Sequence, residues 1–336
     1  MTAPMRFSIV IATYKRAHLL AETLRSLSHL APSAPWEVIV VDNNSPDNTR
    51  EVVEAAIPAF PVPLRYAFEK EQGRSAALNH GFRIAEGEII VTTDDDVWVE
   101  PDWLDTIEFG LATKQCDYVG GRVVPHWESE PPRWIPRTNG RMWAVIALLD
   151  YGPNPIRFGA RVPLGVNMAI RREALERVGG FDTSIGRKAG TLLGQEVREW
   201  CMRAHARGLV GYYIPQIVVR HLIPTERMNK EYFRRWFFWR GISRAMMYAR
   251  TGKDMEAPET SQLDPSRVPH VAGVPRYLFR NALVAVRDVV SAVVRRDHVN
   301  AFERELWLWM FAGIVKQRWR DRQQPAPQAQ RSLSGS

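Results

Sequence analysis

The chain has 336 residues, 45% of them hydrophobic, which excludes a disordered protein and allows a sizeable buried core. Its formal net charge of +8 favours an anionic partner, such as a phosphate-bearing ligand, nucleic acid or a membrane surface, without choosing among them. Two cysteines, Cys116 and Cys201, exclude a disulfide framework and a repeated cysteine–histidine metal site.

Neither a membrane-spanning segment nor an export signal is evident in the sequence. No apolar run reaches the roughly 20 residues that cross a bilayer. The longest uncharged candidate is "LWLWMFAGIV" at 306–315. Residues 1–20 lack the positive start, apolar core and small-residue cleavage site of a signal peptide. We therefore expect a cytoplasmic protein, either soluble or held peripherally at the inner face of the cell membrane.

Short apolar segments alternate with helical patterns through the first 90 residues. Runs rich in β-branched residues, without polar alternation, predict buried strands at 7–12, 37–41, 64–68 and 88–93. Helices are predicted over 20–30, from leucines at helical spacing, and over 73–87, where Gly87 provides a stop. This alternation predicts an α/β fold with a mostly parallel, Rossmann-like sheet and helices on both faces.

The remainder of the chain is less regular. The apolar pattern predicts further elements, namely strands at 118–124, 166–170 and 211–219 and helices at 171–178 and 196–208. The segment 125–163 is irregular and rich in Pro, Gly, Trp and Arg. We expect three parts: a catalytic domain over 1–225, a helical C-terminal extension over 226–322, and a disordered tail over 323–336.

Acidic residues follow two of the predicted strands. In an open α/β sheet, ligands bind beyond the carboxyl ends of the strands, and Asp42 and the run Asp94-Asp95-Asp96 occupy such positions. Each has a simpler alternative, because Asp42 suits a turn and one aspartate could cap the helix that begins near Pro101. Three adjacent carboxylates repel one another, and a bound Mg²⁺ or Mn²⁺ together with a substrate phosphate would relieve that repulsion.

Six short motifs occur in a specific order along the chain, although each motif by itself is weak evidence of a family. They are "SIVIATYKR", "VIVVDNNSPDNT", "GRSAALNHG", "TDDDVWVEPDWL", "PLGVNMAIRREALERVGGFD" and "RHLIPTER". The ordered set resembles the nucleotide-sugar-dependent glycosyltransferases of family 2, over roughly residues 5–245. The resemblance implies a GT-A fold, a Mn²⁺ or Mg²⁺ cofactor, and an inverting sugar transfer from a nucleotide-sugar donor, expected to be a UDP-sugar. The implied acceptor is a hydroxyl of a glycan or of a lipid-linked sugar.

The resemblance also implies roles for individual residues. Those expected to bind the nucleotide sugar are Thr13, Tyr14, Arg16, Asp42, Arg74, Asn79, Asp94 and Asp95. Within this set, Asp42 would accept a hydrogen bond from uracil N3–H, and Asp95 could be the more structural member of the acidic run. Asp96 and His221 would bind the metal, although a single histidine after a strand is as readily structural.

Direct displacement at the anomeric carbon also needs a base for the acceptor proton, and Glu196 is the candidate. Relatives carry Gly-Glu-Asp-x-Asp/Glu where this chain has "GQEVRE", so Val197 stands where the second acid is usual. A shift of one residue in the alignment would put Glu196 on that acid instead. A first-turn glutamate that favours the helix dipole is the alternative for Glu196, and Asp182 is a second candidate base.

The C-terminal extension and the competing functions leave alternatives open. Helices that combine tryptophan and valine stripes with arginines can lie in a membrane interface, or can pack as a subdomain or against a second copy of the chain.

A nucleotidyltransferase acting on sugar phosphates would want a glycine-rich phosphate loop, which "IATYKRAH" does not supply. A non-catalytic nucleotide- or nucleic-acid-binding protein is suggested by charge alone, and we expect no nucleic-acid partner.

Overall fold

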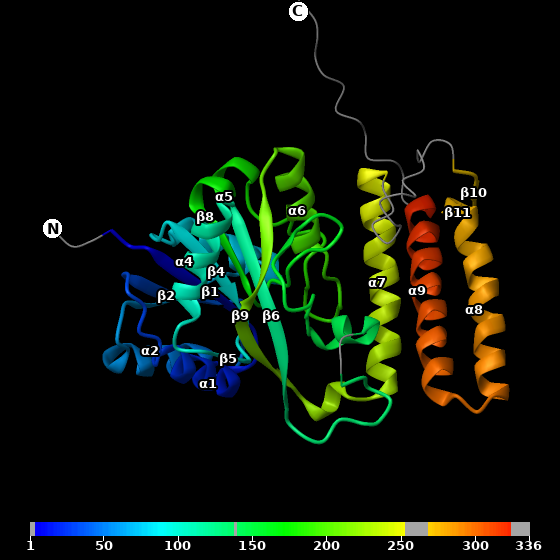
Figure 1. The fold of residues 1–336 in the computed structure, drawn as a ribbon, viewed down its shortest axis with the longest axis horizontal. Coiled ribbons are helices and arrows are strands. Elements are labelled where there is room, and N and C mark those ends of the chain that lie inside the picture. Colours follow the sequence, from blue (N-terminus) through cyan, green and yellow to red (C-terminus); the bar gives the residue numbers. More distant parts are fainter. Residues whose placement is uncertain (1–3, 138–139, 253–267, 324–336) are drawn as a thin grey trace, which may run out of the picture. The chain divides into compact units, whose positions relative to one another are not determined.

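The computed structural model describes residues 4–137, 140–252 and 268–323. The chain divides into two compact units, Met1–Phe233 and Arg234–Ser336 (Figure 1). Apart from Gln323, the predicted disordered tail lies outside the described residues.

In the described part of the N-terminal unit, nine strands form one sheet (Figure 1). They are β1 (Phe7–Thr13), β2 (Trp36–Asp42), β3 (Leu64–Phe68), β4 (Ile89–Thr93), β5 (Val97–Val99), β6 (Tyr118–Trp127), β7 (Ile156–Arg157), β8 (Met168–Arg171) and β9 (Gly211–Ile223). Their order is β3-β2-β1-β4-β8-β6-β9-β5, and β7 also pairs with β9. Strands β3, β2, β1 and β4 run parallel, whereas β8 is antiparallel to β4 and β6. The seven predicted strands are confirmed.

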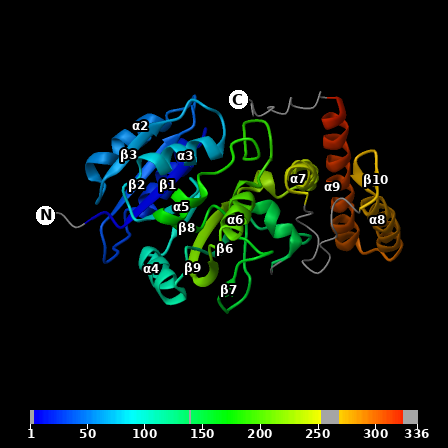
Figure 2. The ribbon, with the colours of Figure 1, turned by 90° about the horizontal axis from the view of Figure 1, so that it is seen from above.

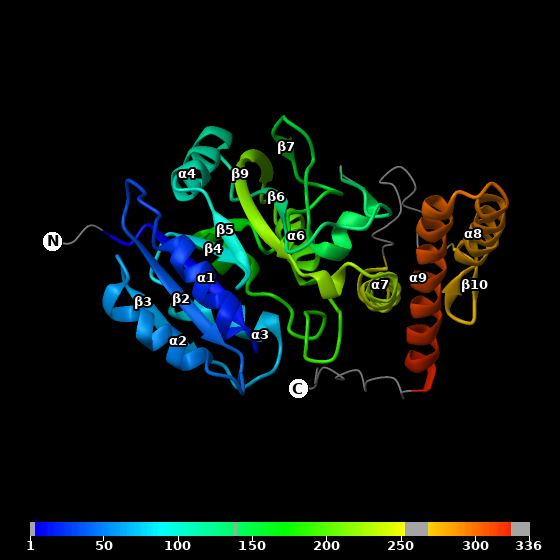
Figure 3. The same cartoon turned by 90° about the horizontal axis from the view of Figure 1, so that it is seen from below.

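Helices cover both faces of the parallel part of the sheet. They are α1 (Ala17–Leu27), α2 (Thr49–Ala56), α3 (Arg74–Ile84), α4 (Trp103–Lys114), α5 (Arg172–Val178) and α6 (Glu196–Ala206). Figures 2 and 3 show α3 on one face and α1 and α2 on the other. Gly81 allows α3 to approach the sheet closely, because a Cβ there would lie 2.3 Å from Val10 Cγ1.

Two elements near the site were not predicted from the sequence. The helix α2 has only eight residues and β5 only three, so each offers too few apolar positions for a helix or strand pattern to be recognised. In the described part of the segment 125–163, the regular elements are the end of β6, the strand β7 and a 3₁₀ turn at Arg141–Ile146. Short elements like these depend on their neighbours in the fold rather than on local pattern.

The C-terminal unit is helical, as predicted, with one small hairpin. Its elements are α7 (Lys230–Thr251), β10 (His270–Val271), β11 (Val274–Pro275), α8 (Arg276–Val294) and α9 (His298–Gln323). Helix α9 lies between α7 and α8 (Figures 1 and 2). The hydrophobic core of the C-terminal unit includes Ala245, Leu278, Met310 and Ile314. Among the described residues, none of the helices has both the length and the apolar character needed to cross a membrane.

Two glycines let α7 and α9 touch backbone to backbone. A Cβ at Gly241 would lie 1.9 Å from the carbonyl oxygen of Met310, and one at Gly313 would lie 2.0 Å from that of Phe238. Because a backbone atom cannot rotate away, we expect Gly241→Ala or Gly313→Ala to destabilise this unit by about 1–3 kcal/mol.

Thermal and urea unfolding of the full chain would measure this loss. Gly194→Ala is the control, since a Cβ there would meet no atom within 4 Å. Unchanged unfolding midpoints for both helix variants would contradict the close crossing.

Candidate active site

Polar residues gather where the parallel strands β1, β2 and β4 end. Thr13 and Asp42 are the last residues of β1 and β2 and are partners in the sheet register. Asp94 directly follows β4, which pairs with β1 on its other side. The Thr13 hydroxyl donates a hydrogen bond to Asp95 Oδ2 at 2.7 Å. The strand ends therefore converge on one rim of the sheet, as the sequence predicted.

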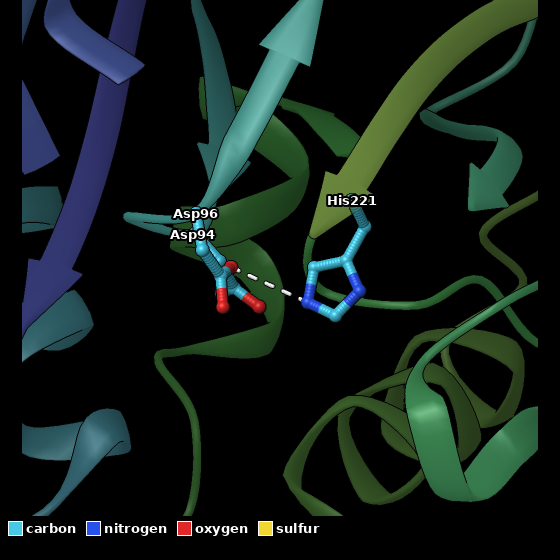
Figure 4. A group of neighbouring side chains, drawn as sticks. All are labelled: Asp94, Asp96 and His221. Atoms are coloured by element: carbon cyan, nitrogen blue, oxygen red, sulfur yellow. Dashed lines mark ion pairs between the residues drawn. The ribbon is translucent and has the colours of Figure 1, made fainter. Parts of the chain in front are cut away.

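Two aspartates and a histidine meet at this rim (Figure 4). Asp94, Asp96 and His221 each offer one ligand atom, and these atoms all lie within 4.8 Å of one another. His221 comes from β9, where it pairs with Val97 of β5, so that β5 fixes the histidine beside the acidic run. The Nε2 atom of His221 lies 3.3 Å from Asp96 Oδ1, and both side chains are 2% exposed.

The chemistry of this cluster fits a divalent cation. Carboxylate oxygen and imidazole nitrogen are both ligands of Mn²⁺-type ions, and Mg²⁺ accepts the carboxylates. Asp96 Oδ1 and His221 Nδ1 are buried, and neither has a hydrogen-bond partner in the described part of the chain. Asp96 Oδ1 is buried with the His221 ring nitrogen 3.3 Å away and no hydrogen bond in the described chain, which is a costly position for a carboxylate oxygen, so a cation suits it.

Arg16, which was predicted to bind the nucleotide sugar, also supplies positive charge to the acidic run, and the sequence did not predict this pairing. One of its guanidinium nitrogens, Nη1, donates to Asp95 Oδ1 at 3.0 Å and to Asp96 Oδ2 at 2.7 Å. Burial opposes ionisation of Asp96, but His221 and Arg16 outweigh it and hold the pKa of Asp96 below its usual range. Burial raises the pKa of Asp95 to about 6, although Arg16 opposes that shift. Repulsion within the acidic run is thus relieved partly by the protein itself.

Asp42 has structural partners for both carboxylate oxygens. Oδ1 accepts from the Ser45 backbone N–H and Oδ2 from the Tyr66 hydroxyl, each at 2.9 Å. Burial, together with this bond to Asp42, raises the pKa of Tyr66 to about 12. The turn-forming alternative is therefore present. A carboxylate has about four lone-pair positions, so a base N–H can also be accepted, and the uracil contact stays a prediction.

Arg74 links the acidic run to the candidate base. Its Nη2 lies 2.6 Å from Asp94 Oδ1, and its Nη1 lies 3.3 Å from Glu196 Oε1. Gly165 leaves room for this guanidinium, because a Cβ there would lie 3.0 Å from Nη1. Glu196 begins α6 with its side chain buried, and its Oε2 has no hydrogen-bond partner among the described residues. Val197, which stands where relatives carry a second acid, lies beside Gly165.

Other candidates have local structural contacts. The Asn79 amide donates to the Phe181 carbonyl and accepts from the Phe181 N–H, both at 2.8 Å, which fastens α3 to the chain after α5. Asp182 accepts from the Ser184 N–H and so orders its own turn. Tyr14 is half-buried, with Lys15 Nζ 5.2 Å from its ring centre. Ligand contacts by Asn79 and Tyr14 stay predictions.

Arg187 is a residue of this region that the sequence analysis did not identify. Its backbone oxygen accepts from the Arg74 N–H at 2.9 Å, so the loop before α6 lies against the start of α3. Its guanidinium is half-buried, and burial lowers its pKa while Glu196 and Asp94 act in the opposite direction. No ion pair to Arg187 occurs within the described ranges. Arg187 and Lys188 form a basic pair in a loop that matches no motif, so no local sequence signal identified Arg187.

Comparison with known proteins identifies the family of this chain. The model of "Glycosyl transferase family 2" matches residues 8–179, just over half of the 336-residue chain. The chain belongs to glycosyl transferase family 2. It is therefore a glycosyltransferase, and the predicted family and enzyme class are confirmed.

The chain is also similar to named proteins. The chain is 26% identical over 247 residues to the glucosyl-dolichyl phosphate glucuronosyltransferase of Haloferax volcanii, covering 72% of this chain and 77% of that protein. It is 28% identical over 120 residues to the dolichol-phosphate mannosyltransferase of Pyrococcus furiosus, covering 36% and 34%.

A solved structure shares the fold. It is the mannosyltransferase PcManGT from Pyrobaculum calidifontis in complex with GDP-Man and Mn²⁺, with a TM-score of 0.60 and 20% identity. The likeness covers 95% of this chain and 88% of that one. The predicted GT-A-type fold of this glycosyltransferase is confirmed.

Proposed function

We propose that this family 2 enzyme transfers a sugar from a UDP-sugar to a hydroxyl of a lipid-linked glycan, in a metal-dependent, inverting displacement. The observation that supports the proposal is the cluster of half-buried Asp94 with buried Asp96 and His221, at the rim where the parallel strands end. The names of two relatives, which contain dolichyl phosphate or dolichol phosphate, support a lipid-linked acceptor.

The donor end of the site would hold the diphosphate. Asp96 and His221, with Asp94 beside them, would bind Mn²⁺ or Mg²⁺, which when bound neutralises charge that grows on the leaving diphosphate. Arg187, which has no ion pair within the described residues, adds a fixed positive charge in the same region. Asp42 would accept the N3–H of uracil at the neighbouring strand end.

The acceptor end of the site would centre on Glu196. In the proposed step, the acceptor oxygen forms a bond to the anomeric carbon while the bond from that carbon to the diphosphate oxygen breaks. The acceptor proton passes to the Glu196 carboxylate. Arg74 engages Oε1 at 3.3 Å, which leaves Oε2, an oxygen with no hydrogen bond in the described chain, to take the proton.

Thermal unfolding with nucleotides would test the donor assignment. We expect UDP with Mn²⁺ to raise the unfolding temperature of the chain, since saturation at about 100 times Kd stabilises a protein by about 2.7 kcal/mol. UDP with EDTA should give a smaller shift, because a cation held by Asp96 and His221 would no longer offset the negative charge of the diphosphate.

GDP with Mn²⁺ is the matched comparison in that experiment. A shift with GDP and none with UDP would contradict uracil recognition by Asp42 but keep the transferase site. No shift with either nucleotide, in the presence of Mn²⁺, would contradict the proposed donor class.

A further inference from the structure

Helix α8 exposes an aliphatic stripe to solvent. Leu283, Val290 and Val294 are 73%, 58% and 77% exposed and follow one another at i, i+7 and i+11, so they share one side of the helix. Val286 and Val293 extend the stripe at 48% and 52% exposure. The residues of α8 that are buried instead are Leu278, Ala285 and Ala292. An exposed aliphatic face of this extent indicates an interaction surface.

The positive charge of the chain lies in this same unit. Residues 234–336 contain 18 Lys and Arg against 9 Asp and Glu, a net charge of +9. Residues 1–233 contain 27 against 28, a net charge of −1. The overall charge of +8 therefore arises entirely in the C-terminal unit, and the catalytic rim does not account for it.

Arginines border the aliphatic stripe. Arg276, Arg280 and Arg287 are exposed and recur at i, i+4 and i+11, which sets them in a row beside the stripe on α8. Asp288, the sole acidic residue of α8, pairs with Arg287 at 2.9 Å. Arg295 and Arg296 follow the end of the helix. Aliphatic side chains with a basic border are typical of a helix that lies in the plane of a membrane interface.

We propose that this α8 face, defined by Leu283, Val286, Val290, Val293 and Val294 with the bordering arginines, docks on an anionic membrane surface. A second copy of the chain would bring two units of charge +9 together, whereas anionic headgroups complement that charge. Nucleic acid would complement the arginines but leave the aliphatic stripe in water. This inference rests on the proposed function, because docking would hold the enzyme at the surface that carries a lipid-linked acceptor.

Vesicle flotation of the full chain would test the α8 face. We expect binding to vesicles of phosphatidylcholine with phosphatidylglycerol, and little binding to phosphatidylcholine alone. Replacing Leu283, Val290 and Val294 together by Gln should weaken binding more than about tenfold, since each buried aliphatic side chain contributes to it. Replacing Arg276 and Arg280 by Gln should weaken binding about fivefold per arginine.

Phe109→Gln is the matched control, because Phe109 is an exposed apolar residue of α4 in the other unit, at 70% exposure. It should bind vesicles like the wild type. The α8 substitutions lie at exposed positions, so the circular dichroism spectrum should be unchanged. The rise in unfolding temperature with UDP and Mn²⁺ should also persist. Loss of vesicle binding with that shift retained would support the α8 face, whatever the acceptor proves to be.

Three results would overturn the inference. Wild-type vesicle binding by the triple Gln variant would exclude the aliphatic stripe. If the arginine substitutions weaken vesicle binding and the triple Gln variant does not, the surface is purely electrostatic, as a surface that binds nucleic acid would be. A dimer in sedimentation velocity that the triple variant dissolves, without any vesicle binding by the wild type, would assign the face to a second copy of the chain.

Discussion

Asp96→Asn is expected to remove most of the metal dependence of donor binding and to lower sugar transfer by about 10²–10³-fold. Asparagine keeps the shape of the side chain but loses its negative charge. That charge is what draws a dication to a position where Oδ1 is buried and has no hydrogen bond in the described structure. Arg16 would also lose its 2.7 Å ion pair and leave a positive charge opposing the metal.

Titration of Mn²⁺ in the presence of UDP, followed by calorimetry or thermal shift, would measure this effect. Asp95→Asn is a matched control one residue away, because Asp95 is bound by Thr13 and Arg16 and is outside the Asp94, Asp96 and His221 group. Asp95 adjoins the proposed metal ligands and shares Arg16 with Asp96, so the control should shift the Mn²⁺ midpoint less than Asp96→Asn does. An unchanged midpoint in Asp96→Asn would refute the metal site.

Glu196→Gln is expected to lower transfer by about 10²–10⁴-fold while donor binding stays near that of the wild type. The amide cannot take the acceptor proton, yet its oxygen can still accept the hydrogen bond from Arg74, now 3.3 Å from Glu196 Oε1. Arg74 also keeps its contact with Asp94 at 2.6 Å, so the donor side of the site is preserved.

Single-turnover transfer and UDP binding, measured on the same variant, would separate these two effects. Glu199→Gln is the control, because Glu199 lies one turn along α6 and pairs with Arg203 at 2.6 Å, outside the acidic rim. Transfer by Glu196→Gln at the wild-type rate would reject Glu196 as the base. Such a result would favour an acceptor that is already ionised, such as a phosphate oxygen, because it needs no base.

Local sequence patterns were enough to predict the α/β fold and the rim. Buried strands are readable because their β-branched runs are continuous, and the register of parallel strands then brings their carboxyl ends together. Asp42 and Asp94 were identified for that reason, and both lie where expected. The irregular middle and the short strand β5 have no such periodicity, so the sequence did not predict how β5 brings His221 to the acids.

The partners of those residues depend on contacts between distant parts of the chain. Arg16 and Asp96 are 80 residues apart, and Arg74 and Glu196 are 122 apart, so no local pattern reports either pair. Asn79 shows the same limit, because no local pattern predicted that its amide would bind the backbone of Phe181, while its ligand contact stays a prediction.

By itself, then, the sequence determined which segments are buried, which acids follow the strands, and where the basic charge accumulates. Burial, strand direction and charge are properties of short segments, and a pattern of residues is sufficient to specify them. Only the tertiary structure decided which cation faces which carboxylate, and which side of α8 stays exposed, because both depend on how separate elements pack against one another.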